Sequence, residues 1–179
     1  MEMKQAMLKN GQTLNLRKAV LQDAEKLIAY CNLVGGESNF LTYGKNGCNR
    51  TVEQERRFLA ELQNQPNSIY LMGFIKGELV CSANLCAEQT ERLAHNCELG
   101  ITVQKKLWGL GAASILMWEL IDFAKNQSTL RAIHLGVYAD NEPAIHLYRK
   151  FGFQTVGRFQ DYFLVDGRYC DELLMDLYL

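Results

Sequence analysis

The segment from Glu98 to Lys125 changes its hydrophobic period halfway, and no other feature constrains the fold of this chain as strongly. Its first part carries apolar, mostly β-branched residues at every second position, as a strand does, whereas its second part repeats apolar residues at helical spacing. A short turn with Gly109 and Gly111 joins the two parts. The segment therefore predicts a strand, a glycine-bearing turn and a helix in direct succession.

Such a turn is suited to binding an anion. The first N–H groups of a helix have no partners inside the helix and lie at the positive end of its dipole. Glycines beside them let a pyrophosphate approach the backbone, because they have no Cβ atom. A dinucleotide-binding loop is a poor match, since Ser114 stands where its third glycine would be, and no Gly-Lys-Ser/Thr marks a P-loop. A tight turn without a ligand explains the two glycines equally well.

A second informative stretch runs from Asp140 to Phe153. Asn141 is a favoured residue before a helix, Pro143 suits its first turn, and Gly152 suits its end. The spacing places Tyr148 on the apolar face of this predicted helix. Spacing alone therefore favours a tyrosine of the core.

Together, the two stretches resemble the acyl-CoA-binding core of the GNAT (Gcn5-related) N-acetyltransferase superfamily. The pyrophosphate loop of that family reads Gln/Arg-x-x-Gly-x-Gly/Ala, and its frame falls on residues 108–113, with Trp108 at the Gln/Arg position. A later family pattern, Asn…Ala-x-x-Leu-Tyr-x-x-x-Gly-Phe, falls on Asn141, Ala144, Leu147, Tyr148, Gly152 and Phe153. The resemblance covers nearly the whole chain. The loop and the Asp166-Gly167 turn look most like the branch with spermidine and ribosomal-protein N-terminal acetyltransferases.

The resemblance implies acetyl-CoA as co-substrate, no metal, and a role for each matched residue. Tyr148 would protonate the sulfur of coenzyme A, and Asn141 would reach the cofactor or a bound water while it caps the helix. The central strand would splay from its neighbour, and main-chain groups of Ile101 and Val103 would bond the pantetheine arm in the gap. The other expected cofactor contacts lie in the turn: Trp108, Gly109, Leu110, Gly111, Ala112, Ala113 and Ser114.

Acetyl transfer from a thioester to an amine requires a neutral amine, a proton for the leaving thiolate and a donor to the carbonyl oxygen. Tyr148 suits the acid role, because a phenol with a pKa of about 10 is protonated at neutral pH. Glu98 is the candidate base, because a partly buried carboxylate has a raised pKa; a solvated carboxylate at a strand end is the alternative. The histidines, His95, His134 and His146, are weaker candidates for catalysis.

The remaining elements predict an α/β (mixed α+β) fold. Asp23 is expected to cap a first helix, and Thr51 with Gln54 forms a capping box before a second. Turn residues Lys76-Gly77 and Asp166-Gly167 predict two hairpins. The resemblance implies a single GNAT-like domain with a central, mostly antiparallel, splayed sheet flanked by helices.

Length and composition agree with one domain over residues 1–179, with its core at about 13–179. A net charge of −1 argues against a nucleic-acid-binding surface. The sequence contains no run of 18 apolar residues, so no membrane helix is predicted, and residues 1–11 lack the apolar core of a signal peptide. The cytoplasm is therefore the expected compartment.

The cysteines show no metal-binding spacing, and the expectation is that they are reduced and mostly buried. They are Cys31, Cys48, Cys81, Cys86, Cys97 and Cys170. Cys97 is the first suspect for a nucleophile, because it adjoins Glu98.

The sequence thus predicts an N-acetyltransferase that uses acetyl-CoA and acts on a small-molecule amine or a peptide N-terminus, with no nucleic-acid or membrane partner. The acceptor is expected to contact loops near residues 35–50 and 159–170. The last strands offer edges through which a homodimer could form. Two alternatives stay open: a non-catalytic acyl-CoA sensor, and an enzyme that forms an acyl intermediate on Cys97.

Overall fold

The computed structural model describes residues 3–179, and within them eight strands form one sheet in the order β1-β2-β3-β4-β5-β6-β8-β7. The neighbouring strands of this sheet are antiparallel, except for β5 and β6, which are parallel. This is the mixed, mostly antiparallel fold that the sequence predicts. The strands are β1 (Lys4–Met7), β2 (Thr13–Lys18), β3 (Ile69–Ile75), β4 (Glu78–Ala87), β5 (Asn96–Val103), β6 (Ala132–Tyr138), β7 (Gln154–Val165) and β8 (Arg168–Tyr178).

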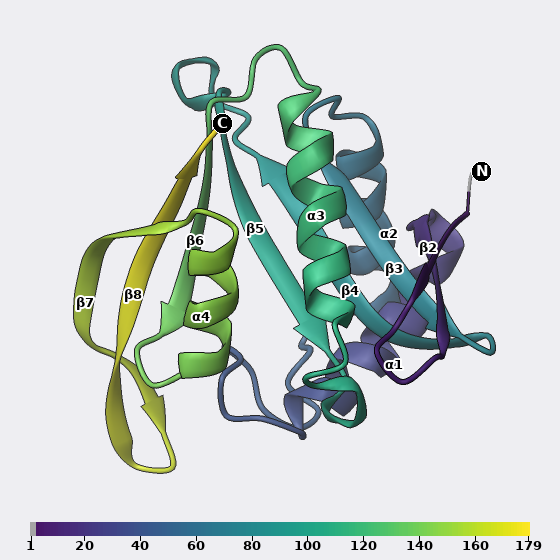
Figure 1. The fold of residues 1–179 in the computed structure, drawn as a ribbon, viewed down its shortest axis with the longest axis horizontal. Coiled ribbons are helices and arrows are strands. Elements are labelled where there is room, and N and C mark those ends of the chain that lie inside the picture. The colour runs from purple at the N-terminus through teal and green to yellow at the C-terminus, as the bar shows by residue number, and fades with distance from the viewer. Residues whose placement is uncertain (1–2) are drawn as a thin grey trace.

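Helices cover both faces of the sheet. On one face lie α3 (Ala112–Lys125) and α4 (Glu142–Lys150), and on the other lie α1 (Ala24–Gly35) and α2 (Val52–Gln63) (Figure 1). Each face has its own apolar core. The larger core joins α3 and α4 to the sheet, and the smaller one joins α1 and α2 to β3.

Local sequence signals place most element boundaries. Thr51 and Gln54 form the predicted capping box, in which the Gln54 amide donates to Thr51 Oγ1 at 3.2 Å. Gly152 has a φ of 94° where α4 ends, as a glycine in this position requires. The predicted role of Asp23 as a side-chain cap was wrong: its carboxylate instead binds Arg17 and the amide of Val20.

The sheet opens in its middle. β5 and β6 pair only from Asn96 with Ala132 to Glu98 with His134. Beyond this point the two strands diverge toward the ends at which α3 and α4 begin (Figure 1). This confirms the splayed sheet that the family resemblance implies.

Two further expectations need correction. β1, which pairs with β2, was not predicted from the sequence; residues 1–2 of the N-terminal segment lie outside the described part. Only Cys81 and Cys97 are buried, while the other four cysteines are half-buried, and all six are free thiols. The expectation of mostly buried cysteines was therefore wrong, because several occupy positions at the rim of a core.

The buried face of α3 yields a prediction on stability. Leu120 is completely buried, so Leu120→Ala should lower the free energy of unfolding by about 2–5 kcal/mol through lost transfer energy and a cavity. Leu33→Ala, the same substitution at a half-exposed site of α1, should change it by less than about 0.5 kcal/mol. Urea denaturation of both variants checks this, and equal losses would contradict it.

Candidate functional site

The edge of β5 that faces the opening carries free main-chain groups. The amide of Gln104 donates to the carbonyl of Val80, and that of Glu88 donates to the carbonyl of Asn96. In an antiparallel ladder the hydrogen-bonded positions alternate, so the even-numbered residues of β5 bond to β4. Ile101 and Val103 therefore direct their N–H and C=O groups toward the opening, where β6 no longer pairs. These are the two residues that the sequence assigned to the pantetheine arm.

The turn after β5 leaves the start of α3 open. Gly109 and Gly111 have φ values of 74° and 97°, a conformation that favours glycine. The amides of Ala112, Ala113 and Ser114 donate no hydrogen bond to any residue that the structure describes. These three N–H groups at the positive end of the helix form the kind of site that binds phosphate. Phosphate contacts by the turn remain a prediction.

Trp108 does not take the place of the family's polar side chain. Its indole Nε1 donates to the carbonyl of Val103 at 2.9 Å, and about half of the residue is exposed. The indole thus folds back onto the end of β5 and occupies one of the free acceptors at the opening. This bond holds the turn against the strand, and the indole N–H is therefore not directed at an anion.

Tyr148 lies on the α3–α4 side of the sheet. Its ring packs against Phe153 with centroids 5.8 Å apart, in the same core as Leu135 and Val137 of β6. Its hydroxyl has no hydrogen-bond partner among residues 3–179, and burial raises the pKa of the phenol to about 12. The phenol therefore stays protonated at neutral pH and is free to donate, although burial makes it a weaker acid than an exposed tyrosine.

Asn141 begins α4 as predicted. Its Oδ1 accepts a hydrogen bond from the amide of Ala144 at 3.3 Å, which confirms the cap. Its contact with the cofactor stays a prediction.

Glu98 lies on the opposite, α1–α2 side of the sheet, as does Thr102, which donates to the hydroxyl of Tyr30 in α1. The side chain of Glu98 is exposed, which agrees with the alternative of a solvated carboxylate at a strand end. Burial raises the pKa of the nearby Cys86 thiol, and this thiol also feels the negative charge of Glu98 and the positive charge of Arg50. A carboxylate and a guanidinium thus flank Cys86 on the same face.

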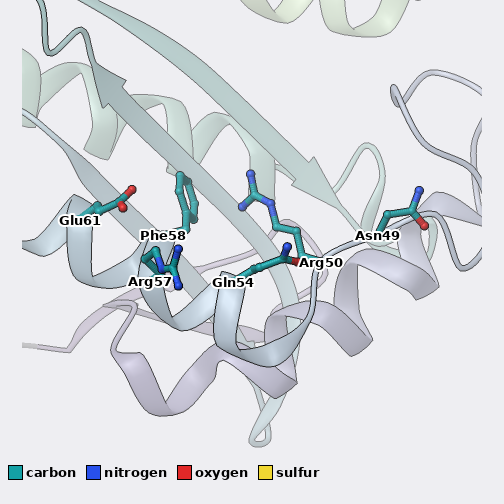
Figure 2. A pocket seen from close by; sticks show the side chains of 6 residues that line it. All are labelled: Asn49, Arg50, Gln54, Arg57, Phe58 and Glu61. Carbon is teal, nitrogen blue, oxygen red and sulfur yellow. The ribbon is translucent and has the colours of Figure 1, made fainter.

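Arg50 is part of the wall between α2 and the sheet. Its guanidinium lies 4.4 Å from the ring centroid of Phe58 and bonds to Glu55 at 3.1 Å. Figure 2 shows Arg50 and Phe58 extending toward the strands from a pocket of about 370 Å³. None of the predicted site residues lines this pocket, whose residues are Asn49, Arg50, Gln54, Arg57, Phe58 and Glu61.

The two predicted acceptor loops meet. Asn39 Nδ2 donates to Asp166 Oδ2 at 2.9 Å, which ties the loop after α1 to the hairpin of β7 and β8. Phe40 packs edge-on against Tyr138, and Tyr138 stacks on Phe163 with centroids 3.7 Å apart. Aromatic rings from three distant segments thus form one wall beside the end of β6.

The alternative nucleophile is not accessible. Cys97 is fully buried, its Sγ lies 3.6 Å from the carbonyl oxygen of Ala132, and burial raises the pKa of its thiol to about 12. Such a thiol is protonated and shielded, so the structure argues against an acyl intermediate on it. Of the histidines, His134 binds Asp176 at 2.7 Å, whereas His95 and His146 are exposed.

Sequence reasoning missed Glu172 in β8. Its side chain is buried at the end of β6 and makes no ion pair or hydrogen bond with residues 3–179. The available signal was a carboxylate directly before the apolar run Leu173 to Met175. In the described residues, no cluster of three or more His, Cys, Asp or Glu is placed to hold a metal, and no helix is long and apolar enough to span a membrane.

Comparisons with known proteins agree with this geometry. Residues 40–153 match the family model described as the Acetyltransferase (GNAT) family. The L-amino acid N-acetyltransferase AaaT of Escherichia coli K12 is 34% identical over 114 residues, which cover 64% of this chain and 70% of that protein.

Two solved structures are similar over most of their length. An acetyltransferase of the GNAT family from Streptococcus pneumoniae superimposes with a TM-score of 0.89 at 32% identity, over 93% of this chain and 99% of that one. A GNAT superfamily phosphinothricin acetyltransferase from Sinorhizobium meliloti, in complex with acetyl-CoA, superimposes with a TM-score of 0.80 at 17% identity, over 93% of this chain and 88% of that one.

The conformation of the turn before α3 yields a second prediction. Gly111→Ala should lower the free energy of unfolding by about 1–3 kcal/mol, because alanine is strained at a φ of 97°. Gly44→Ala is the control, since Gly44 lies outside the left-handed region and an added Cβ would meet open space. That variant should be unchanged or slightly more stable. Urea denaturation compares the two, and an unaffected Gly111→Ala would refute the strain.

Proposed function

Because this chain belongs to the GNAT acetyltransferase family, we propose that it moves an acetyl group from acetyl-CoA to a primary amine by direct attack on the thioester. The observation that carries this proposal is the distribution of groups around the opening of the sheet. A protonated phenol lies on the α3–α4 side, carboxylates lie on the α1–α2 side, and the free edge of β5 lies between them.

The residues present fit acetyl-CoA as co-substrate. The amides of Ala112, Ala113 and Ser114 would bind the pyrophosphate at the start of α3. Ile101 and Val103 would bond the amides of the pantetheine arm as an added strand would, with Asn141 as a further contact. Acetyl-CoA then supplies an activated acetyl group, and the chain positions it in the opening.

The proposed transfer needs two proton movements. As the amine nitrogen bonds to the carbonyl carbon, the carbon–sulfur bond breaks and Tyr148 donates its phenolic proton to the sulfur. The proton of the amine leaves on the opposite side of the sheet, where a carboxylate can accept it; Glu98, the predicted base, lies on that side. Because the acid and the base lie on different faces of the sheet, no direct proton transfer takes place between the phenol and the carboxylate.

The charges on the acceptor side favour an amine that also carries an acidic group. Glu98 would attract the ammonium, and Arg50, which acts on the same thiol of Cys86, would attract a carboxylate. The similarity to an L-amino acid N-acetyltransferase supports the same choice. We therefore propose L-amino acids as the first acceptors to test, ahead of polyamines and peptide N-termini.

Tyr148→Phe tests the mechanism. Turnover, measured as thiol release with L-amino acids, polyamines and short peptides, should fall about 100-fold or more, because the leaving thiolate loses its acid. Binding of coenzyme A should change less than about twofold, since the phenol makes no other bond. Tyr178→Phe removes the hydroxyl of an exposed tyrosine and should leave turnover unchanged.

Other outcomes would decide against the proposal. Binding of coenzyme A without turnover on any amine would favour the sensor alternative. Loss of turnover in Cys97→Ala with ping-pong kinetics would favour the acyl intermediate. Absence of coenzyme A binding in the wild type would overturn the assignment as a whole.

A further inference from the structure

Glu172 is a buried carboxylate without a partner. Only 9% of the residue is exposed, and no hydrogen bond or ion pair connects its side chain to any described residue. Burial, and then the negative charge of Glu98, raise the pKa of this carboxyl. The carboxylate oxygens still reach solvent, since no fully buried side-chain oxygen of the described residues lacks a partner. A carboxyl of raised pKa without a partner, beside the opening of the sheet, is a candidate for a functional group.

The strand order places this carboxylate at the opening. β8 lies between β6 and β7, and Glu172 is paired with Tyr138 of β6. Its side chain leans over Gly136, where a Cβ atom would clash with Glu172 Oε1. Gly136 comes two residues after His134, the last residue of β6 that pairs with β5. Glycine at this position thus gives the carboxylate room at the point where β6 leaves β5.

Glu172 lies on the acceptor side of the sheet. Side chains alternate along a strand, so Glu172 shares its face with Asp176, whose carboxylate bonds to His134. His134 is in register with Glu98, which lies on the α1–α2 side. Glu98 and Glu172 therefore lie on the same face of the sheet, and the negative charge of Glu98 contributes to the raised pKa of Glu172. Tyr148 packs on the other side of β6, so the two Glu residues and the phenol approach the opening from opposite faces.

We propose that Glu172 is a catalytic residue, which binds the ammonium group of the acceptor together with Glu98 and accepts its proton during transfer. This inference rests on the proposed function. The ammonium gives one proton to the carboxylate of Glu172, and the neutral nitrogen bonds to the carbonyl carbon. The carbon–sulfur bond breaks, the sulfur takes the proton of Tyr148, and the acylated nitrogen releases its second proton to solvent. Solvent then takes the proton from Glu172 and restores that of Tyr148.

Glu172 is better suited to this step than Glu98. Its partial burial raises the pKa of the carboxyl, which makes the carboxylate more basic. Glu98 is exposed, so it is suited to attract the cation and hold it beside Glu172. The titratable groups on the same face of the sheet are Glu98 on β5, His134 and Tyr138 on β6, and Cys170 and Asp176 on β8, with His134 bonded to Asp176.

The test compares three isosteric amide variants over a range of pH, with the best acceptor of the wild type. Glu172→Gln should lower kcat by about 100-fold or more and should lose the acidic limb of the pH profile. In the wild type this limb falls with falling pH, because protonation of Glu172 removes the base. Glu98→Gln should mainly raise KM for the amine and keep the limb. Asp171→Asn, a neighbour bound to Arg158 on the other face, should keep both rate and profile.

A stability measurement separates catalysis from a structural role. Because the folded state raises the pKa of Glu172, its carboxylate destabilises the fold at pH values above that pKa. Glu172→Gln should therefore melt at the same temperature as the wild type or higher. Glu172→Asp keeps the charge on a side chain that is shorter by one methylene group. This variant should retain the acidic limb of the pH profile but have a lower kcat.

Each result decides the matter. An active Glu172→Gln variant with an intact acidic limb overturns the proposal, and so does loss of that limb in Glu98→Gln alone. A Glu172→Gln variant that loses both activity and thermal stability indicates a structural role. If the wild type acetylates no amine, the proposed function itself fails. This outcome can be told apart from failure of the role of Glu172, because it is seen without any substitution.

Discussion

The end of pairing between β5 and β6 is the constraint on which the whole site depends. A strand that loses its neighbour leaves N–H and C=O groups that require other partners. Here these groups belong to Ile101 and Val103, and the indole of Trp108 already binds the carbonyl of Val103. The same edge is what an amide-bearing ligand such as a pantetheine arm can use as an added strand. Under the proposed function, the defect in the sheet is the binding surface.

The opening also divides the chemistry between two environments. On the α3–α4 side the groups are apolar and tightly packed, and Tyr148 is kept protonated by burial. On the α1–α2 side lie Glu98, Glu172 and Arg50, which is why we propose a charged acceptor. A thioester in the opening would be reached by the acid from one face and by the amine from the other. This separation allows burial to raise the pKa of Tyr148 on one face and that of Glu172 on the other independently of each other.

For the proposed binding of an acceptor, the positions of individual charged groups matter more than the net charge of the chain. The net charge of −1 predicts no long-range steering of a cation or an anion, yet the acceptor side holds two carboxylates and a guanidinium around the thiol of Cys86 and the end of β6. Glu172 illustrates the cost of such placement. Its raised pKa means that the charged carboxylate lowers the stability of the fold, and such a loss is typical of functional groups.

The sequence by itself determined the boundaries of most elements and the position of Tyr148, because capping boxes, terminal glycines and hydrophobic periods act between residues close along the chain. It did not reveal β1, the packing of Glu172 or the position of Gly136 beneath it. Those depend on which distant segments become neighbours: β8 inserts between β6 and β7, and only then does Glu172 lie over Gly136. Burial and the fields of nearby charges are properties of that packing, so only the tertiary structure decided which carboxylates face the opening.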